Sequence, residues 1–250
     1  MLRDGAGLAA VTARLAAGMG VGVRVLPMTE AEVSTTVSTG DGCELSYQEF
    51  LVRHGAAPTV VAVRHDGMSG ARPAPGVIEA IRAADVVIIG PSSPCASVDP
   101  ILGLSGVWEA IRSCAADVVA VTPIVTRVPV AGTGEERRAA ARAALLAAEG
   151  VPATATAIAA RYRDIGARFV LDTADAVEAS EILAAGVPVR VAGTLLHRGA
   201  PAAPLLDAVL ARQRDRVDVG TERARFPPGR GTVSEFKGRD ARVSSRSVSE

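Results

Sequence analysis

The sequence predicts an α/β protein built on a parallel β-sheet, and three observations lead to this class. Two short runs rich in β-branched residues, 85–89 and 117–121, have the length and composition of buried strands. Helical patterns at 75–82 and 105–114 alternate with these strands, as in the βαβ units of a parallel sheet. Apolar residues make up 48% of the chain and aromatic residues only 3%, so Ala, Val, Leu and Ile must form most of the core.

The first third of the chain carries weaker signals. An amphipathic helix is expected at 5–18, where Leu8, Val11 and Leu15 recur at helical spacing. Glycines at 40 and 42 flank Asp41 and predict a turn. The remaining elements expected in this part are strands at 21–27, 33–38 and 59–63 and a helix at 47–54.

The regular alternation continues beyond the second buried strand and then stops. We expect helices at 135–149, 154–162, 175–185 and 202–212, and strands at 170–171 and 187–191. Residues 1–211 are therefore expected to form one α/β domain. Residues 212–250 lack apolar periodicity and carry Pro227-Pro228-Gly229, an excess of arginine and a serine-rich end, which predicts a disordered basic tail.

Charge and composition argue against several functional classes. The formal net charge is zero, so the body offers no electrostatic case for binding nucleic acid or an anionic membrane. No apolar stretch reaches the length of a membrane span, and the first 25 residues lack a signal-peptide core, so we expect a cytoplasmic protein. Cys43, Cys95 and Cys114 are odd in number and widely spaced, which fits neither a disulfide framework nor a zinc site. No metal ligands are predicted.

Hydroxyl side chains follow both buried strands at the point where each strand ends. Gly90-Pro91 ends the first strand, and Ser92, Ser93 and Ser97 come next. Thr122 directly follows the second strand. Ligands of open α/β sheets bind at the carboxyl ends of the strands, so these hydroxyls are candidates for phosphate or substrate contacts. The alternative is that they cap turns and helices, which is also the role expected for Asp99, Asp172 and Asp175.

Any phosphate recognition in the body must rest on arginine, hydroxyl groups and backbone N–H groups. The only lysine is Lys237, in the expected tail, so a phosphate-binding loop with its lysine and a Schiff-base lysine are both excluded from the body. The planar guanidinium of arginine is suited to phosphate oxygens.

Four segments share unusual motifs, in the same order, with one known family. They are residues 1–30, 47–54, 73–102 and 119–125, of which 73–102 begins P-A-P-G-V-I-E-A-I and contains G-P-S-S-P. On these motifs, residues 1–211 resemble the 2-phospho-L-lactate transferase family, the CofD-like proteins of coenzyme F-420 biosynthesis. The resemblance implies a Rossmann-like three-layer parallel sheet with a small helical subdomain.

The resemblance also implies a reaction. Members of the family transfer a phospholactate or phosphoenolpyruvate group from a GDP-activated donor to the deazaflavin Fo, release GMP and depend on Mg²⁺. The catalytic residues stay unknown, because positioning and charge neutralisation accomplish this chemistry without a covalent nucleophile. Arg53 stands at the family's recurrent arginine, where it either faces the ligand or forms a surface or interdomain salt bridge.

The chain departs from the family pattern at three places. The family's N-terminal strand, glycine-rich loop and Asp-containing stretch have no counterpart here, so we expect an N-terminally truncated domain that is inactive alone. We also expect this domain to form a homodimer or to pair with another chain that supplies the missing part. Ser93 replaces the family's usual Asn, and Thr126-Arg127 replaces a Gly-Gly pair. These changes keep open a second function, a non-catalytic nucleotide- or sugar-binding regulator of the gluconeogenesis-factor type.

Overall fold

A four-stranded parallel sheet forms the centre of the protein, with strand order β4-β5-β6-β7. In this computed structural model, residues 5–130, 132–196 and 202–211 are described. Val86 pairs with Asp117, Val119 pairs with Arg168, and Phe169 pairs with Val189, all in parallel register. The strands are β4 (Val86–Ile89), β5 (Asp117–Val121), β6 (Arg168–Asp172) and β7 (Val189–Ala192). The predicted α/β class and parallel sheet are confirmed.

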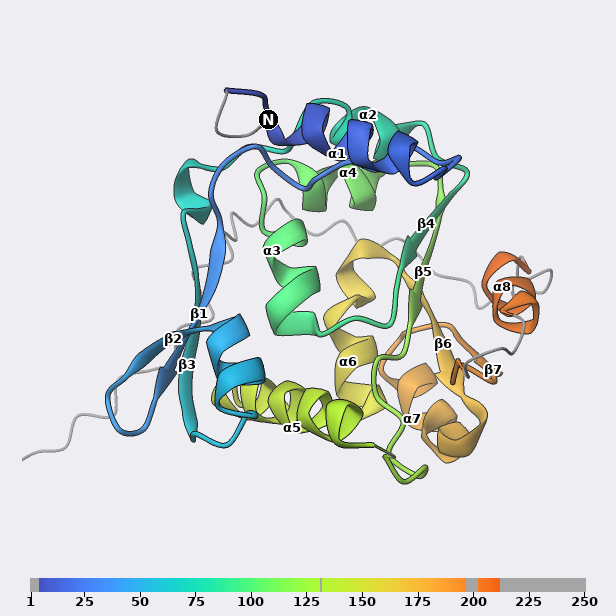
Figure 1. Cartoon of the computed structure of the whole chain (residues 1–250). Helices are drawn as coiled ribbons and strands as arrows, with labels where there is room; N and C mark the ends of the chain where they lie inside the picture. Colours follow the sequence, from blue (N-terminus) through green and yellow to red (C-terminus); the bar gives the residue numbers. More distant parts are fainter. Residues whose placement is uncertain (1–4, 131, 197–201, 212–250) are drawn as a thin grey trace, which may run out of the picture. The chain divides into compact units, whose positions relative to one another are not determined.

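Helices connect the strands and cover both faces of the sheet (Figure 1). The α-helices are α1 (Leu8–Gly18), α2 (Val77–Arg82), α3 (Asp99–Leu102), α4 (Val107–Ser113), α5 (Thr133–Ala148), α6 (Ala155–Arg161), α7 (Ala179–Ala184) and α8 (Ala203–Leu210). Short helical turns of 3₁₀ or π type are η2 (Glu49–Arg53), η3 (Met68–Gly70), η4 (Pro94–Val98), η5 (Arg163–Ile165) and η6 (Thr173–Glu178). The predicted disordered tail at 212–250 lies outside the described residues.

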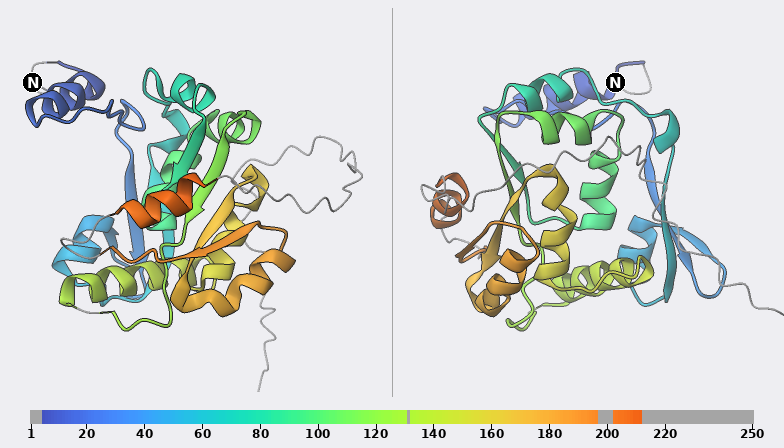
Figure 2. Two further views of the ribbon diagram at one scale, coloured as in Figure 1. Left: turned by 90° about the vertical axis from the view of Figure 1, so that its right-hand side faces the viewer. Right: turned by 180° about the vertical axis from the view of Figure 1, so that it is seen from behind.

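The two faces of the sheet are covered very unequally. Val118 and Ala120 of β5 point into the large core, which also contains side chains of α3 to α7. Val119 and Val121, one residue out of phase, point to the opposite face, where Val209 of α8 covers them. This alternation follows from the two-residue period of a strand. Figure 2 shows α8 lying across this second face.

A second sheet stands beside the first, and the sequence predicts two of its strands, at 33–38 and 59–63, but not their assembly into a separate sheet. Strands β1 (Ser34–Thr39), β2 (Glu44–Ser46) and β3 (Val60–Asp66) pair in antiparallel fashion in the order β2-β1-β3. Beside the parallel sheet, the resemblance implied only a small helical subdomain. Val37 at the centre of β1 is fully buried and joins the large core, and α5 packs against β3. The second sheet is therefore part of the packing that supports the parallel sheet.

The strand expected at 21–27 is wrong, because this segment has no regular secondary structure. Val21, Val23 and Val25 are all exposed, so their alternation with small residues does not mark a buried face. The helix expected at 47–54 is present but contains the π-type turn η2. In residues 5–130, 132–196 and 202–211, no helix is long and apolar enough to cross a membrane.

Candidate functional site

The end of β4 carries the first candidate residues. Ser92 is exposed, and its N–H donates to the carbonyl of Gly90 at 2.7 Å, which makes a tight turn. The Ser93 carbonyl accepts hydrogen bonds from the N–H groups of Ser97 and Val98, at 3.0 and 3.2 Å, and so opens η4. In the part of the chain that the structure describes, the Ser93 hydroxyl is buried and has no hydrogen-bond partner. A buried hydroxyl without a partner has hydrogen-bonding capacity left for a ligand.

The segment η4 is held from the second sheet. The Nε2 atom of His65 on β3 lies 2.8 Å from the carbonyl oxygen of Cys95, which follows Pro94 in η4. Cys95 itself is fully buried, and burial raises the pKa of its thiol. Helix α5 also packs against η4. Ser93 and Ser97 therefore lie on a backbone segment that β3 and α5 restrain.

Thr122 occupies the end of β5, as predicted, but its side chain is used locally. Its hydroxyl donates to the carbonyl of Ile124 at 2.6 Å, and the residue is only 2% exposed. Its N–H donates to the carbonyl of Val170 at 3.0 Å and extends the pairing of β5 with β6. In this conformation Thr122 shapes the turn, and its contact with a ligand stays a prediction.

Two buried aspartates at the end of β6 hold the loops that leave the neighbouring strands. Asp175 accepts hydrogen bonds from the N–H of Thr126 at 2.7 Å, the hydroxyl of Thr126 at 2.8 Å and the N–H of Arg127 at 3.1 Å. Asp172 accepts hydrogen bonds from the N–H and hydroxyl of Thr194, at 2.7 and 2.8 Å. Asp175 therefore fixes the loop after β5, and Asp172 fixes the loop after β7.

Asp172 also caps its own helical turn. Its Oδ1 atom accepts a hydrogen bond from the N–H of Ala174 at 2.8 Å. Burial raises the pKa of Asp172, but the hydrogen bonds from Ala174 and Thr194 together lower the pKa more, so it lies below its usual value. The structural roles expected for Asp172 and Asp175 agree with these contacts.

Arg53 lies at the end of η2 and is exposed. Helix α5 packs against both η2 and η4, so it connects the element carrying Arg53 to the element carrying Ser97. The structure places Ser92, Ser93, Ser97 and Thr122 at the carboxyl edge of the sheet. A ligand contact by Arg53 remains a prediction.

A cluster of possible metal ligands includes Cys95 of η4. The ligand atoms of Cys95, Asp99 and Glu149 lie within 4.8 Å of one another. Arg161 occupies this cluster, because its Nη2 lies 2.5 Å from Asp99 and its Nη1 lies 2.9 Å from Glu149. Burial raises the pKa of Asp99, although Arg161 acts in the opposite direction. A cation would have to displace the guanidinium, so we interpret the cluster as a structural ion pair that joins α3, α5 and α6.

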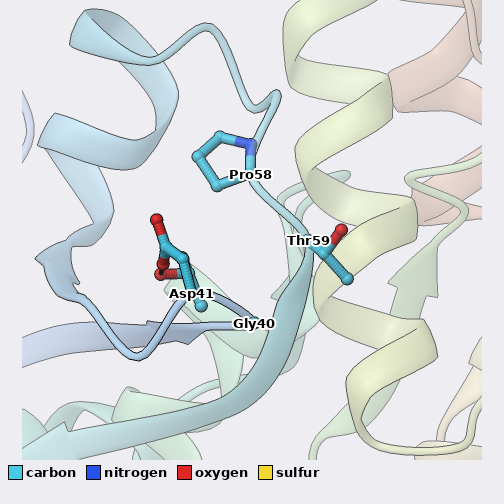
Figure 3. A pocket seen from close by; sticks show the side chains of 5 residues that line it. Gly40, Asp41, Pro58 and Thr59 are labelled. Atoms are coloured by element: carbon cyan, nitrogen blue, oxygen red, sulfur yellow. Dashed lines mark hydrogen bonds between the residues drawn. The ribbon is translucent and has the colours of Figure 1, made fainter.

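Two shallow hollows lie away from the serine turn. One, of about 180 Å³, lies at the tip of the β1–β2 hairpin, where Asp41 and Pro58 line it (Figure 3). The Asp41 carboxylate is already engaged by the hydroxyl of Thr39 and the N–H of Cys43. The other, of about 270 Å³, lies between Gly55 and the first turns of α5, where Glu136 and Arg137 contribute opposite charges. Neither hollow contains a predicted site residue.

Sequence reasoning missed the contacts that organise this edge. Asp175 and Thr126 are separated by 49 residues, and His65 and Cys95 by 30, so no local pattern links them. Asp175 was recognised only as a structural residue, and Arg127 only as a departure from a glycine pair. Their pairing depends on β5 and β6 being neighbours in the sheet.

Comparison with known proteins identifies what this chain is similar to. Residues 1–186 match the family model described as 2-phospho-L-lactate transferase CofD. A phosphoenolpyruvate transferase from Streptomyces griseus is 36% identical over 226 residues, which cover 89% of this chain and 66% of the relative. A 2-phospho-L-lactate transferase from Methanosarcina mazei is 33% identical, over 70% of this chain and 54% of the relative.

The chain is shorter than these relatives, and solved structures share its fold. It spans 60% of a phosphoenolpyruvate transferase from Kitasatospora aureofaciens, to which it is 38% identical over 78% of its own length. The crystal structure of a UPF0052 family member from Bacillus halodurans matches with a TM-score of 0.56 and 21% identity, over 82% of this chain and 67% of that one. At this level of identity the match supports the fold alone.

Proposed function

We propose, because this chain belongs to the 2-phospho-L-lactate transferase CofD family, that it transfers a phosphoenolpyruvate or phospholactate group from a GDP-activated donor to the deazaflavin Fo. The match over residues 1–186 carries this proposal, since it includes the serine turn after β4 and the loop after β5. The chain covers less than two thirds of these relatives, so activity, donor and acceptor are all part of the proposal.

The chemistry asks mainly for positioning and for groups that accommodate negative charge. The terminal hydroxyl of the acceptor forms a bond to phosphorus, the bond from phosphorus to the GMP oxygen breaks, and the hydroxyl proton passes to solvent. The Ser93 hydroxyl, which has no partner among the described residues, can donate to a phosphate oxygen. The exposed backbone around Ser92 lies on the same turn and offers room for the substrate.

The Mg²⁺ that the family resemblance implies does not fit the carboxylates described at this edge. All four carboxylate oxygens of Asp172 and Asp175 accept hydrogen bonds from N–H or hydroxyl donors. Coordination of an ion by any of these oxygens would compete with the hydrogen bonds that hold the loops after β5 and β7 and the turn η6. We derive no step through the metal, and Mg²⁺ enters the proposal only as a component of the ligand solution.

A second protein chain is a further part of the proposal. Among the described strands, β4 pairs only with β5, so its other edge presents unpaired backbone groups. Ile88 of β4 is 46% exposed, although it pairs with Val119 and therefore lies on the same face of the sheet as α8. These features support either a homodimer or a partner chain at this edge. Light scattering after size-exclusion chromatography tests the dimer, and a monomeric mass with no binding partner contradicts both.

A thermal-shift assay on the full chain tests the proposed function. The ligands are Fo alone, GDP with Mg²⁺, and both together, because a ligand that binds the folded state raises the melting temperature. We expect stabilisation by Fo, followed by turnover when donor is supplied. Stabilisation by GDP without any effect of Fo favours a nucleotide-binding regulator. A cooperative transition that responds to neither ligand contradicts the transferase proposal.

A further inference from the structure

We propose that Arg127 contacts a phosphate group of the substrate and that the buried Asp175 is its positioning residue. This inference rests on the proposed function, because it assigns a phosphate contact to the same carboxyl edge. Arg127 belongs to the pair Thr126-Arg127, which stands where the family that this chain resembles has a Gly-Gly pair. It is therefore a property of this chain that a family match does not supply.

The first step is the rigidity of the loop. Asp175 is fully buried, and three of its hydrogen bonds, at 2.7 to 3.1 Å, go to Thr126 and to the backbone of Arg127. Hydrogen bonds to a buried carboxylate are stronger than neutral ones, because the acceptor is charged and shielded from water. The backbone of Arg127 is thus held in one orientation at the end of β5.

The second step is the free end of the arginine. Its side chain is 56% exposed, and its Nε lies 3.9 Å from Oδ1 of Asp175. Within the described residues, the two terminal guanidinium nitrogens of Arg127 make no hydrogen bond or ion pair. The guanidinium therefore has its Nε side near the Asp175 carboxylate and offers its terminal N–H groups to solvent. Two parallel N–H groups match two oxygens of a phosphate.

The third step is location. The loop with Arg127 leaves β5, the serine turn leaves β4, and these strands are hydrogen-bonded neighbours in parallel register. Both segments therefore emerge on the same edge, where ligands of α/β sheets bind. Two other arginines near the sheet are already engaged, since Arg161 pairs with Asp99 and Glu149, and Arg168 pairs with Asp117. Arg127, in contrast, is exposed, and its two terminal guanidinium nitrogens are accessible to a ligand.

The experiment compares Arg127→Gln with Arg163→Gln by isothermal titration of the full chain with GDP and, separately, phosphoenolpyruvate, both with Mg²⁺. Arg163 is a matched control, because it is similarly exposed but lies in η5 at the opposite, amino edge of the sheet. We expect Arg127→Gln to weaken binding of one probe by about tenfold or more, as for a lost hydrogen bond to a charged group. Arg163→Gln should bind as the wild type does. The probe that is affected identifies which phosphate Arg127 contacts.

Asp175→Asn tests the positioning role separately. The amide keeps the shape of the carboxylate but places an N–H₂ donor where an acceptor is needed, so the loop should loosen. We expect weaker binding of the same probe at a temperature where the variant is fully folded by circular dichroism. Arg127→Lys should recover part of the affinity, because a charge without the planar fork remains.

The outcomes separate this inference from the proposed function. If the wild type binds a probe and Arg127→Gln binds it equally well, the inference is overturned while the proposed function stands. If Asp175→Asn is less stable but binds normally when folded, Asp175 is structural only. If the folded wild type binds neither probe, the phosphate contact and the proposed function both fail.

Discussion

The carboxyl ends of β4 and β6 lie on the same edge of the sheet, but they differ in whether their polar groups already have hydrogen-bond partners. At the β6 end, every carboxylate oxygen of Asp172 and Asp175 accepts a hydrogen bond from the loop after β5, the loop after β7 or the turn η6. At the β4 end, Ser92 is exposed, and the Ser93 hydroxyl lacks a partner among the described residues. The difference indicates that the β6 end stabilises the loops, whereas the β4 end retains hydrogen-bonding capacity for a ligand.

Removing the carboxylate of Asp175 should have the largest effect on these loops. Asp175→Ala removes the buried acceptor of the N–H groups of Thr126 and Arg127, and we expect a loss of about 3 kcal/mol in the free energy of unfolding. Urea denaturation followed by circular dichroism measures it. Asp164→Ala, at an exposed aspartate, is the control and should change stability little. Equal stability of the two variants would show that the loop after β5 does not depend on Asp175.

Arg161→Met tests the support behind the β4 end. It leaves Asp99 and Glu149 without their shared partner, and we expect a loss of about 2 kcal/mol near neutral pH. Burial already raises the pKa of Asp99. A carboxyl group whose folded-state pKa is raised stabilises the fold most when protonated, and this contribution is lost as the pH rises through that pKa. The variant should therefore recover stability in mild acid, which pH-dependent denaturation checks, and a pH-independent loss contradicts this explanation.

Asp172→Asn should have a smaller effect with the opposite pH dependence. The pKa of Asp172 lies below its usual value, so the stabilisation by its carboxylate is present at neutral pH and is lost as the pH falls through the folded-state pKa. We expect the variant to lose about 1 kcal/mol at neutral pH and to show a flatter acid limb. An acid limb identical to that of the wild type would refute this assignment.

Ser93→Ala should have the smallest effect on stability and so sharpen the contrast between the two ends. The substitution removes a buried hydroxyl that has no described partner, so the free energy of unfolding should change by less than about 0.5 kcal/mol or rise slightly. Ligand binding should nevertheless weaken in the thermal-shift assay. A large loss of stability with unchanged ligand binding would instead make Ser93 a structural residue.

The sequence predicted the parallel sheet well because its strands are encoded locally. The strand expected at 117–121 coincides with β5, since the run of Val and Ala is bounded on both sides by polar residues. The strand expected at 21–27 failed, although its composition is similar, because no neighbouring strand is present to pair with it among the described residues. Local composition favours an extended chain, but pairing decides whether a strand forms.

The candidate site likewise has features that the sequence predicts locally and features that depend on the tertiary structure. The sequence alone located Ser92, Ser93, Ser97 and Thr122 at strand ends, because glycine, proline and hydroxyl residues mark where a buried strand stops. Only the tertiary structure decided which of these side chains are already engaged. The Thr122 hydroxyl donates to the carbonyl of Ile124, whereas the Ser93 hydroxyl has no partner among the described residues. Asp175 accepts hydrogen bonds from a loop about 49 residues earlier in the chain. The physical reason is that strand ends follow from short-range composition, whereas hydrogen-bond partners depend on which strands become neighbours in the sheet.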